Sequence, residues 1–417
     1  MCAIGSAGVC RSRTGKASGT QRLLRFCSLK QTDMSTSETS SAATLSASTS
    51  SQVRRDKVLA RVSAVCQTRL RPVVRNVDEQ GEYPDVTMRH LGAVGLYAQH
   101  LTGHGENTSI DMPLAIESMA LVGFECLSTA FCVWCHDACG WYLENTANTA
   151  LRDAVLPSIA SGMSLGGTGL SNPMKFYSGI ETLRLKAERV DGGYLVNGTI
   201  PWVSNLGPDH YFGIVFEEFC DPEHRVMALV RCDRDGVELC DGGRFIALEG
   251  SRTYAVRMKN CFVDDGSVLA DPADEYINAI RPGFVLMQVG MAVGHVRACI
   301  TQMRKYDTTH DYVNQFLPDG ADQLEAEMEE LLTRTNTLAQ SPQETDRLFV
   351  RDSLRACLDA GELSMKAAQA CMLSGGARAY MENSVPFRKL REAYFVGVVT
   401  PATKHLRKEI ARLTAIT

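Results

Sequence analysis

The pattern of hydrophobic and polar residues divides the chain into three successive parts. Between residues 53 and 165, hydrophobic residues recur every three or four positions, as they do on one face of an α-helix. This spacing predicts helices over residues 53–77, 86–96, 112–123, 126–142 and 149–161. The first part is therefore expected to be an N-terminal helical domain.

The pattern changes at Gly166, where strand-like alternation replaces the helical repeat. Turn-forming residues then recur at regular intervals through residues 166–272: Gly192-Gly193, Asp221-Pro222, Asp235-Gly236, Gly242-Gly243 and Asp264-Asp265-Gly266. Turns at such intervals predict a small antiparallel β-barrel or sandwich. Helical spacing returns near Tyr276, and residues 273–417 are expected to form a C-terminal helical bundle. Its helices are predicted over 284–312, 322–340 and 346–373, with a last helix in two pieces around Pro401. The predicted fold class is α+β.

The stretch from Thr168 to Asn205 carries the strongest local signals of the β region. Gly192-Gly193 and Asn197-Gly198 tolerate positive φ, so each predicts a hairpin turn in a small meander. Hydroxyl-bearing residues open this stretch, and Trp202 lies near its end. Short hydroxyl-bearing loops beside an aromatic ring suit a flat, polar cofactor. We therefore expect a ligand-binding edge here.

Residues 1–52 differ in composition from the rest of the chain and are expected to be a disordered leader or a targeting segment. Residues 1–33 contain six Arg or Lys and no acidic residue before Asp33, as in organelle-targeting segments. Met34 is an alternative translation start, and residues 34–52 are almost all Ser, Thr and Ala, which predicts no regular structure. We expect a cytoplasmic protein, or a mitochondrial one if residues 1–33 are a genuine targeting segment.

Composition narrows the function classes. The net charge of −5, without a basic stripe in the folded part, argues against nucleic-acid binding. No uninterrupted apolar run reaches the roughly 18 residues that a membrane span needs, so no span is predicted. The fifteen cysteines follow no secretory signal, which favours reduced and mostly buried thiols.

Two motifs have simpler interpretations than cofactor or metal binding, and for a third both interpretations stay open. Cys132-Val133-Trp134-Cys135-His136 spells the haem-attachment pattern, but it lies in an apolar helical stretch without a second cysteine pair, which predicts buried side chains and no metal site. Gly166-Gly167-Thr168-Gly169 lacks the Lys-Ser/Thr of a phosphate loop, which argues against nucleoside triphosphate binding. Gly375-Gly376 follows an apolar helix, where it either ends the helix or brings backbone amides close to a phosphate.

Several short strings, in one order along residues 53–413, resemble motifs of the acyl-CoA dehydrogenase superfamily of flavoproteins. The most specific is residues 186–205, KAERVDGGYLVNGTIPWVSN. It is similar to the family string A-x-x-x-G-x-Y-x-(L/I)-N-G-x-K-x-W-(I/V)-(T/S)-N. Residues 78–84 (DEQGEYP), 156–162 (LPSIASG) and 388–395 (RKLREAYF) resemble three further family motifs. The resemblance implies a helical domain, a middle β domain and a C-terminal helical bundle.

The resemblance also implies a function and a set of cofactor-binding residues. It implies FAD, with FMN as the alternative, and oxidation of the CH–CH bond of an acyl-CoA by hydride transfer to the flavin. An electron-accepting flavoprotein and assembly as a homotetramer or homodimer are expected. Ser204 matches the family hydroxyl that contacts flavin N5, and Trp202 matches the aromatic residue that packs against the flavin ring. Thr168 or Asn172 would lie at the pyrimidine edge of the ring, and Ser178 near the phosphates and the substrate. Gly375 and Gly376 match the backbone contact to the diphosphate bound by a neighbouring subunit.

Two departures from the family pattern change what is expected of FAD binding and of the catalytic base. His310 stands where the family has the Arg that binds the FAD diphosphate, and Thr400 stands where it has the catalytic Glu. Phe284 occupies the alternative base position on the first C-terminal helix. The catalytic base is therefore unknown, with Glu275, His136 and His405 as weak candidates.

Two other functions stay open beside the dehydrogenase. One is a flavin-dependent monooxygenase of the same fold, supplied with reduced flavin by a flavin reductase and acting on a small organic substrate. The other is a non-catalytic homologue, against which the intact Trp202 and Ser204 argue.

Overall fold

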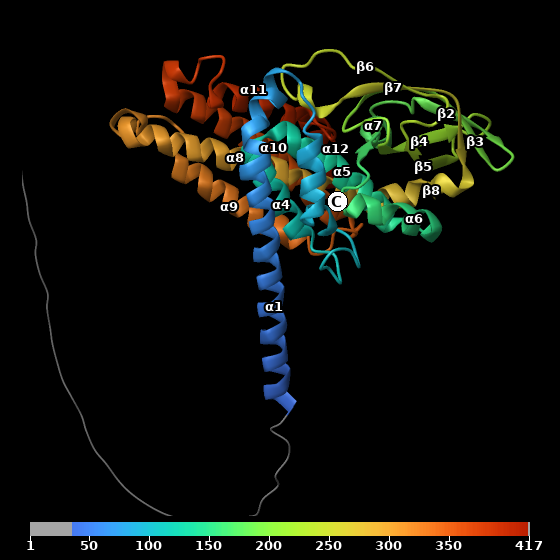
Figure 1. Cartoon of the computed structure of the whole chain (residues 1–417), viewed down its shortest axis with the longest axis horizontal. Coiled ribbons are helices and arrows are strands. Elements are labelled where there is room, and N and C mark those ends of the chain that lie inside the picture. Colours follow the sequence, from blue (N-terminus) through green and yellow to red (C-terminus); the bar gives the residue numbers. More distant parts are fainter. Residues whose placement is uncertain (1–35, 416–417) are drawn as a thin grey trace, which may run out of the picture. The chain divides into compact units, whose positions relative to one another are not determined.

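The computed structural model describes residues 36–415, with side chains from residue 51 onward (Figure 1). The chain divides into a unit of residues 1–51 and a unit of residues 52–417. The prediction for residues 1–33 lies outside the described residues. Helix α1 (Thr36–Val65) corrects the expectation of no regular structure over residues 34–52. Helix propagation adds one hydrogen bond per residue, and the buried Val58 and Val62 anchor the helix at its other end.

The N-terminal domain is helical, as predicted. After α1 its elements are the π-helical η1 (Cys66–Leu70), the 3-10 helices η2 (Arg71–Val73) and η3 (Leu96–Ala98), and α2 (Val74–Glu79), α3 (Asp85–Ala93), α4 (Met112–Glu125), α5 (Leu127–Asn145) and α6 (Thr149–Ala160). The Asp111 and Asn148 side chains cap α4 and α6 by accepting hydrogen bonds from backbone N–H groups of the first turn. Helix α5 is buried on all sides from Leu127 to Leu143, so it is the central helix of the fold.

The CxxCH motif lies inside this central helix. Cys132, Cys135 and His136 are fully buried, which confirms their assignment as buried helix residues. The cysteines with described side chains are free thiols, and ten of these twelve are buried, as expected for a reduced protein.

The middle domain is built on one mostly antiparallel sheet. Its elements are β1 (Gly166–Thr168), α7 (Ser171–Tyr177), β2 (Leu185–Val190), β3 (Gly193–Val203), β4 (Tyr211–Glu218), β5 (Arg225–Arg231), β6 (Val237–Asp241), η4 (Glu249–Ser251), β7 (Tyr254–Asp264), η5 (Asp265–Ser267) and β8 (Val268–Ala270). The strand order is β6-β7-β3-β2-β4-β5-β8, and β1 pairs with β4 in parallel. Because β6 and β8 remain as ends, the sheet is sandwich-like rather than a closed barrel.

The two predicted hairpin turns have different outcomes. Val190 pairs with Gly193, so Asp191 and Gly192 form a two-residue hairpin loop, as predicted. The hairpin predicted at Asn197-Gly198 is wrong, because β3 continues through it to Val203. Gly198 instead adopts φ 135° at a register shift against β7, where an added Cβ would lie 2.2 Å from the Arg184 carbonyl oxygen. Asn197 and Gly198 therefore form a β-bulge in the continuous strand β3.

The C-terminal domain is a helical bundle. Its elements are α8 (Asp274–Asn314), α9 (Ala321–Leu338), α10 (Arg347–Gly375), the 3-10 helix η6 (Gly376–Arg378), α11 (Val385–Val398) and α12 (Thr403–Ala415). The last helix is split around Pro401, as predicted, but α8 begins at Asp274 and passes through Pro282 instead of starting near Phe284. In Figure 1 the far ends of α8 and α9 lie on the left and the β-strands on the right.

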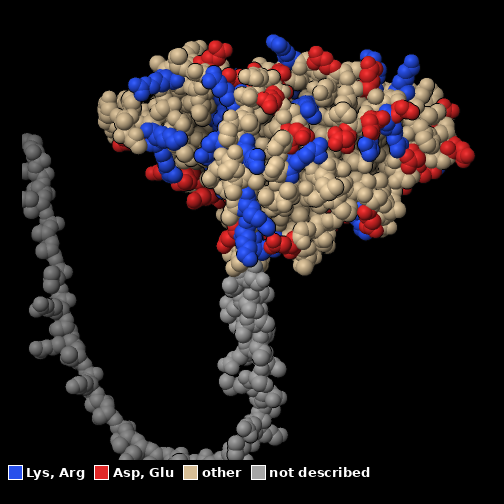
Figure 2. Space-filling view, in the orientation of Figure 1, with Lys and Arg blue, Asp and Glu red and all other residues tan. Residues whose placement is uncertain are grey.

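Helix α8 connects the helical domains through close backbone contact with α4. A Cβ added at Gly294 would lie 2.2 Å from the Ala120 carbonyl oxygen, so glycine allows the two helices to touch. By length and composition α8 could cross a membrane, but 94% of its most apolar window is buried inside the protein. Its apolar character is that of a core helix. On the face in Figure 2, acidic and basic side chains are interspersed.

Candidate functional site

Backbone strain marks one region of the β domain. Five residues other than glycine have positive φ among the described residues: Trp202, Asn205, Leu248, Arg252 and Asn260. The first four lie on segments 202–205 and 248–252, which bond to each other through Asn205 N to Ser251 O at 2.9 Å. Such conformations cost free energy and gather where function requires a fixed geometry. This region is therefore a candidate binding site.

These segments and their neighbours form what we call the polar edge, made of Thr168, Trp202, Ser204, Asn205 and Thr253. Asn205 is fully buried and connects it to its surroundings. Its Nδ2 donates to the Gly166 carbonyl at 2.6 Å, and its Oδ1 accepts from the Tyr83 hydroxyl at 2.6 Å. Asn205 thus joins β1, the end of β3 and the N-terminal domain.

A chain of hydroxyl groups runs along the polar edge. Ser204 Oγ lies 2.6 Å from Thr253 Oγ1, which lies 2.8 Å from Ser251 Oγ. Ser251 donates to the Leu248 carbonyl at 2.6 Å. Because each hydroxyl has one proton, Thr253 must donate to Ser251 and Ser204 must donate to Thr253. In this arrangement Ser204 offers a ligand an acceptor lone pair.

Thr168 is fixed beside Ser204 by its own contacts. Thr168 and Ser204 form an isolated antiparallel bridge. Thr168 Oγ1 lies 2.6 Å from the Tyr142 hydroxyl and accepts from Leu170 N at 3.3 Å. A Cβ at Gly167 would lie 2.3 Å from the Ser204 carbonyl oxygen, so only glycine permits this approach. The predicted partners Thr168 and Ser204 are therefore brought together.

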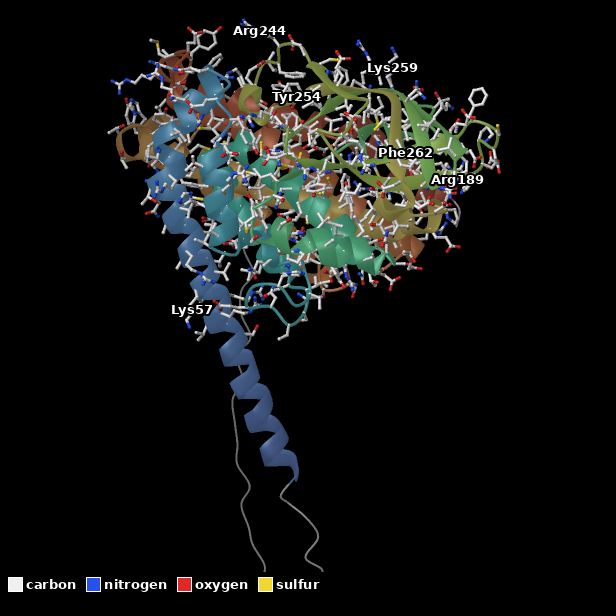
Figure 3. All side chains as sticks on the ribbon, turned by 45° about the vertical axis from the view of Figure 1, so that its right-hand side comes forward. Lys57, Arg189, Arg244, Tyr254, Lys259 and Phe262 are labelled. Carbon is white, nitrogen blue, oxygen red and sulfur yellow. The ribbon has the colours of Figure 1, made fainter. Side chains whose placement is uncertain are left out.

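Trp202 is the exposed member of the polar edge. Its side chain is 55% exposed, whereas Ser204, two residues later in the chain, is nearly buried. A pocket of about 320 Å³ borders Thr253 and is also lined by Tyr83, Arg252 and Tyr254. Figure 3 labels Tyr254 at the start of β7. An exposed aromatic plane beside fixed hydroxyls has the chemistry to hold a flat heteroaromatic ring.

Thr400 lies where the β domain meets the C-terminal helices. Its hydroxyl is 2.8 Å from Ser171 Oγ on α7, and its carbonyl accepts from Gln288 Nε2 at 2.8 Å. The alternative base position, Phe284, packs edge-on against Trp134 with ring centroids 4.8 Å apart. At both positions the described contacts are to hydroxyl, amide and aromatic groups instead of to a carboxylate.

The structure does not bring Glu275 to Thr400. Glu275 is exposed in the first turn of α8, thirteen residues before Gln288. At 1.5 Å per residue this is about 20 Å along the helix axis. Glu275 is therefore not a base for chemistry at Thr400.

His136 is a positioning residue of the core instead of a pocket base. Its Nε2 donates to the Ile159 carbonyl at 2.9 Å, and its Nδ1 accepts from Gly166 N at 3.1 Å. Both ring nitrogens are engaged, and this bonding assigns the neutral tautomer. Burial lowers the pKa of His136 from its ordinary value of 6.5 to about 3. His136 therefore fixes the start of β1.

His405 and Ser178 are brought together, but in the interior. His405 Nε2 lies 2.5 Å from Ser178 Oγ, and Lys408 Nζ donates to the Ser178 carbonyl. Both side chains are less than 5% exposed. Burial lowers the pKa of His405 to about 4. The pair fastens the end of the α7 segment to α12 and does not line the polar edge.

Asn172 also serves the α7 segment. Its Nδ2 donates to Glu181 Oε2 at 3.1 Å and to the Thr182 carbonyl at 2.9 Å, and its Oδ1 accepts from Arg184 N at 3.0 Å. All of its polar atoms are therefore used to close this segment onto itself. Of the two residues predicted for the pyrimidine edge, Thr168 is the one at the polar edge.

The residues predicted for the diphosphate lie in a second region. His310 is exposed near the end of α8, with Nδ1 2.6 Å from Thr309 Oγ1. Gly375 packs against the Tyr306 ring, and Gly376 ends α10 with φ 55°. His310 follows Gln288 by 22 residues, about 33 Å along α8. The predicted cofactor residues of one chain thus form two separate groups.

The sequence reasoning missed the partners that orient the polar edge. Tyr142, Ser251, Thr253, Ser171 and Gln288 were not predicted, although they hold Thr168, Ser204 and Thr400. Thr253 is 49 residues from Ser204, and Ser171 is 229 residues from Thr400. A hydroxyl residue in a turn carries no local signal for such distant pairing.

Comparison with known proteins identifies the fold. Residues 54–163 match the family model described as acyl-CoA dehydrogenase, N-terminal domain. Probable acyl-CoA dehydrogenase YngJ of Bacillus subtilis is 24% identical over 360 residues, covering 82% of this chain and 92% of that protein. Butyryl-CoA dehydrogenase from Megasphaera elsdenii superposes with a TM-score of 0.76 at 15% identity, over 87% of this chain and 98% of that one.

An enzyme with a different reaction is nearly as similar in structure. Dibenzothiophene monooxygenase from Paenibacillus sp. A11-2 superposes with a TM-score of 0.72 at 17% identity, over 84% of this chain and 95% of that one. The resemblance to the acyl-CoA dehydrogenase superfamily is confirmed, and so is the predicted fold class. The reaction does not follow from the fold, because this fold serves both dehydrogenation and monooxygenation.

The lowered pKa of His136 predicts that the free energy of unfolding depends on pH. The native imidazole stays neutral down to about pH 3, whereas the unfolded one takes up a proton near pH 6.5. The neutral His136 therefore makes its full contribution to the free energy of unfolding above pH 6.5. This contribution is lost as the pH falls below 6.5, by up to about 1.4 kcal/mol per pH unit. His136→Gln can keep both hydrogen bonds but has no proton to gain. Urea unfolding at pH 7, 6 and 5 should show a shallower loss of stability for the variant. Equal slopes for both proteins would contradict this account.

Proposed function

We propose that this chain, which has the acyl-CoA dehydrogenase fold, is a flavin-dependent oxidoreductase that binds the flavin ring at the polar edge. The observation that carries the proposal is the exposed Trp202 beside the fixed hydroxyls of Ser204 and Thr168, on a strained backbone. When bound, the flavin would supply two-electron redox chemistry that no side chain provides.

The residues of the polar edge fit the ring half of a flavin. Trp202 would pack against the ring, Thr168 would meet its pyrimidine edge and Ser204 would meet N5. Tyr142 and Thr253 hold the two hydroxyls in place before any ligand arrives. This preorganisation lowers the entropy that binding must overcome.

Dehydrogenation of an acyl-CoA is the first candidate reaction. It is supported by relatives named as acyl-CoA dehydrogenases over most of their length. Such a reaction also needs the α-proton to leave, and a threonine hydroxyl does not remove a carbon-bound proton near neutral pH without a stronger base beside it. The Thr400 hydroxyl is hydrogen-bonded to the Ser171 side chain, which is itself a hydroxyl and not a stronger base. No carboxylate therefore stands at the position expected for the base that removes the α-proton.

Monooxygenation is the second candidate, and the Thr400–Ser171 contact favours it. A monooxygenase inserts oxygen with the help of reduced flavin and needs no base at Thr400. The acceptor lone pair of Ser204 suits the N5–H of a reduced flavin better than the bare N5 of an oxidised one. The substrate would then be a small organic molecule and the partner a flavin reductase, instead of an acyl-CoA and an electron-accepting flavoprotein. The cytoplasmic location stays a prediction in either case.

We also propose that the chain assembles with itself through the end where α8 meets the α10–α11 connection. Large apolar side chains are exposed there: Tyr312, Phe316, Leu373, Tyr380 and Met381. Phe316 and Tyr380 are 82% and 80% exposed, which is unusual for such residues unless a partner covers them. A homodimer or homotetramer would bury this set.

Trp202 gives a direct test of flavin binding. Trp202→Ala should weaken binding about tenfold by removing the stacked ring, whereas Trp202→Phe should keep most of it. Titration followed by quenching of flavin fluorescence measures the change. Phe262→Ala is the matched control, because Phe262 is a 42%-exposed aromatic on β7 (Figure 3). If the wild-type protein binds no flavin, the non-catalytic homologue is the correct description.

The two reactions give different results without oxygen. A dehydrogenase should lose its yellow colour when a suitable acyl-CoA is added anaerobically, in a screen over chain lengths. A monooxygenase should keep its colour with every acyl-CoA and, once reduced and given oxygen, should consume oxygen with an organic substrate. Thr400→Glu restores a carboxylate at the base position. Bleaching by an acyl-CoA in this variant alone would show that the missing carboxylate is what prevents dehydrogenation.

Self-association is tested by sedimentation. Phe316→Glu with Tyr380→Glu should convert the assembly into monomers, because two charges would be buried at the interface. Phe219→Glu, at a 75%-exposed aromatic of the β4–β5 turn, is the control and should leave the assembly intact. A wild-type protein that sediments as a monomer at micromolar concentration would refute the proposal.

A further inference from the structure

His224 lies between two carboxylates of the β domain and is partly buried against them. Its Nδ1 is 2.9 Å from Glu218 Oε2, and its Nε2 is 2.5 Å from Asp271 Oδ1. An ionised carboxylate only accepts hydrogen bonds, so each ring nitrogen must carry a proton to bond in this way. The geometry therefore requires the charged imidazolium form of His224.

The two carboxylates belong to segments that are distant in the sequence. Glu218 ends β4 and His224 directly precedes β5, whereas Asp271 stands between β8 and α8. Strand β8 has three residues and lies at one end of the sheet. His224 thus ties the chain that enters α8 to the β4–β5 turn, beside a short edge strand.

The residue after His224 joins the same two segments. The Arg225 carbonyl accepts from Ala273 N at 2.8 Å, and Arg225 Nε donates to Asp274 Oδ1 at 2.8 Å. The Arg225 guanidinium also lies over the Phe176 ring of α7, 5.4 Å from its centroid. Two consecutive residues of the β4–β5 turn therefore hold the start of α8 on the sheet.

The other charged and titratable groups around His224 do not replace its proton. The Tyr194 hydroxyl donates to Asp271 Oδ2 at 2.8 Å, and burial raises the pKa of Tyr194, so this group stays neutral. Arg189, labelled in Figure 3, lies over the Tyr194 ring and pairs with Asp265. The charged residues of the turn and of the first turn of α8 are Asp221, Glu223, Arg225, Asp274 and Glu275. Loss of the His224 proton would leave two carboxylates facing each other across a neutral ring.

We propose that His224 is a pH-sensitive clasp, which as the imidazolium holds the chain entering α8 against the β4–β5 turn and as the neutral imidazole releases it. The inference is independent of flavin binding and adds a response to pH. The hydrogen bond to Asp271 raises the pKa of His224 above its ordinary value of 6.5; burial opposes this rise, and Glu218 adds to it. The stabilisation is therefore complete below pH 6.5 and is lost as the pH rises through the raised value.

Titration of the full-length protein, followed by NMR of labelled histidine side chains, tests the protonation state. The His224 signal, identified by its loss in His224→Gln, should titrate with a pKa above 6.5. Urea unfolding between pH 6.5 and 8.5 should show a loss of stability that is smaller in this variant. His136 does not interfere, because its contribution is constant in this range. His90→Gln is the matched control, since His90 Nδ1 contacts the Val86 carbonyl instead of a carboxylate.

Hydrogen exchange shows whether the clasp acts at the start of α8. The amides of Ala273 and Ile277, which donate to the Arg225 and Ala273 carbonyls, report on this turn. After correction for the intrinsic effect of pH, both should exchange roughly two- to fivefold faster at pH 8.5 than at pH 6.5, as expected for a partly exposed ion pair. His224→Gln should remove this difference. Asp271→Asn keeps an acceptor for the tyrosine hydroxyl but removes the charge, and should reduce the difference.

Three results would overturn the proposal. One is a His224 pKa at or below 6.5, and another is an equal loss of stability in the wild-type protein and in His224→Gln. The third is unchanged exchange at Ala273 and Ile277, because His224 would then bind its carboxylates without holding the start of α8. If His224→Gln does not fold, the wild-type titration and Asp271→Asn decide the question, since the His224 signal is then the one that this variant shifts.

Discussion

The close approach of β1 to β3 is the constraint on which the candidate site depends. A Cβ at Gly167 would lie 2.3 Å from the Ser204 carbonyl oxygen, and one at Gly166 would lie 2.5 Å from Cys139 Sγ. Glycine at both positions lets β1 pass between α5 and the end of β3. Asn205 then joins both strands by donating to the Gly166 carbonyl. Without this contact Thr168 and Ser204 would not lie side by side, and the polar edge would not form.

Helix α5 sets the position of β1 from the other side. His136 accepts the Gly166 N–H, and Tyr142 bonds to the Thr168 hydroxyl. Two side chains of the helical domain thus fix the two ends of a three-residue strand in the β domain. This arrangement gives a physical role to a histidine that resembles a haem or catalytic residue in sequence. A neutral, fully bonded imidazole in the core holds the backbone in place and does not exchange protons near neutral pH.

Much of the fold follows from local sequence signals, whereas the site follows only in part. Helical spacing, the Asp191-Gly192 turn and the family motif at residues 186–205 predict the order of a helical region, a sheet and a helical bundle, and they single out Trp202 and Ser204 as candidate site residues. The bulge at Asn197-Gly198 shows the limit of turn signals: pairing with β7 keeps β3 continuous through a dipeptide that favours a hairpin. The hydroxyl partner of Ser204 is set by the path of the chain, and nothing near Thr253 in sequence announces it.

The two departures from the family pattern concern charge. Thr400, whose carbonyl accepts from Gln288 in the middle of α8 and whose hydroxyl contacts Ser171, stands where the family has a carboxylate. Near His310 carboxylates are added, because Asp307 and Asp311 flank the position of the expected arginine. The polar edge needs no net charge to hold a flat ring. Under the proposed function it would keep the recognition of the flavin ring, whereas the group at Thr400 would distinguish the two candidate reactions. The fold alone does not decide the reaction.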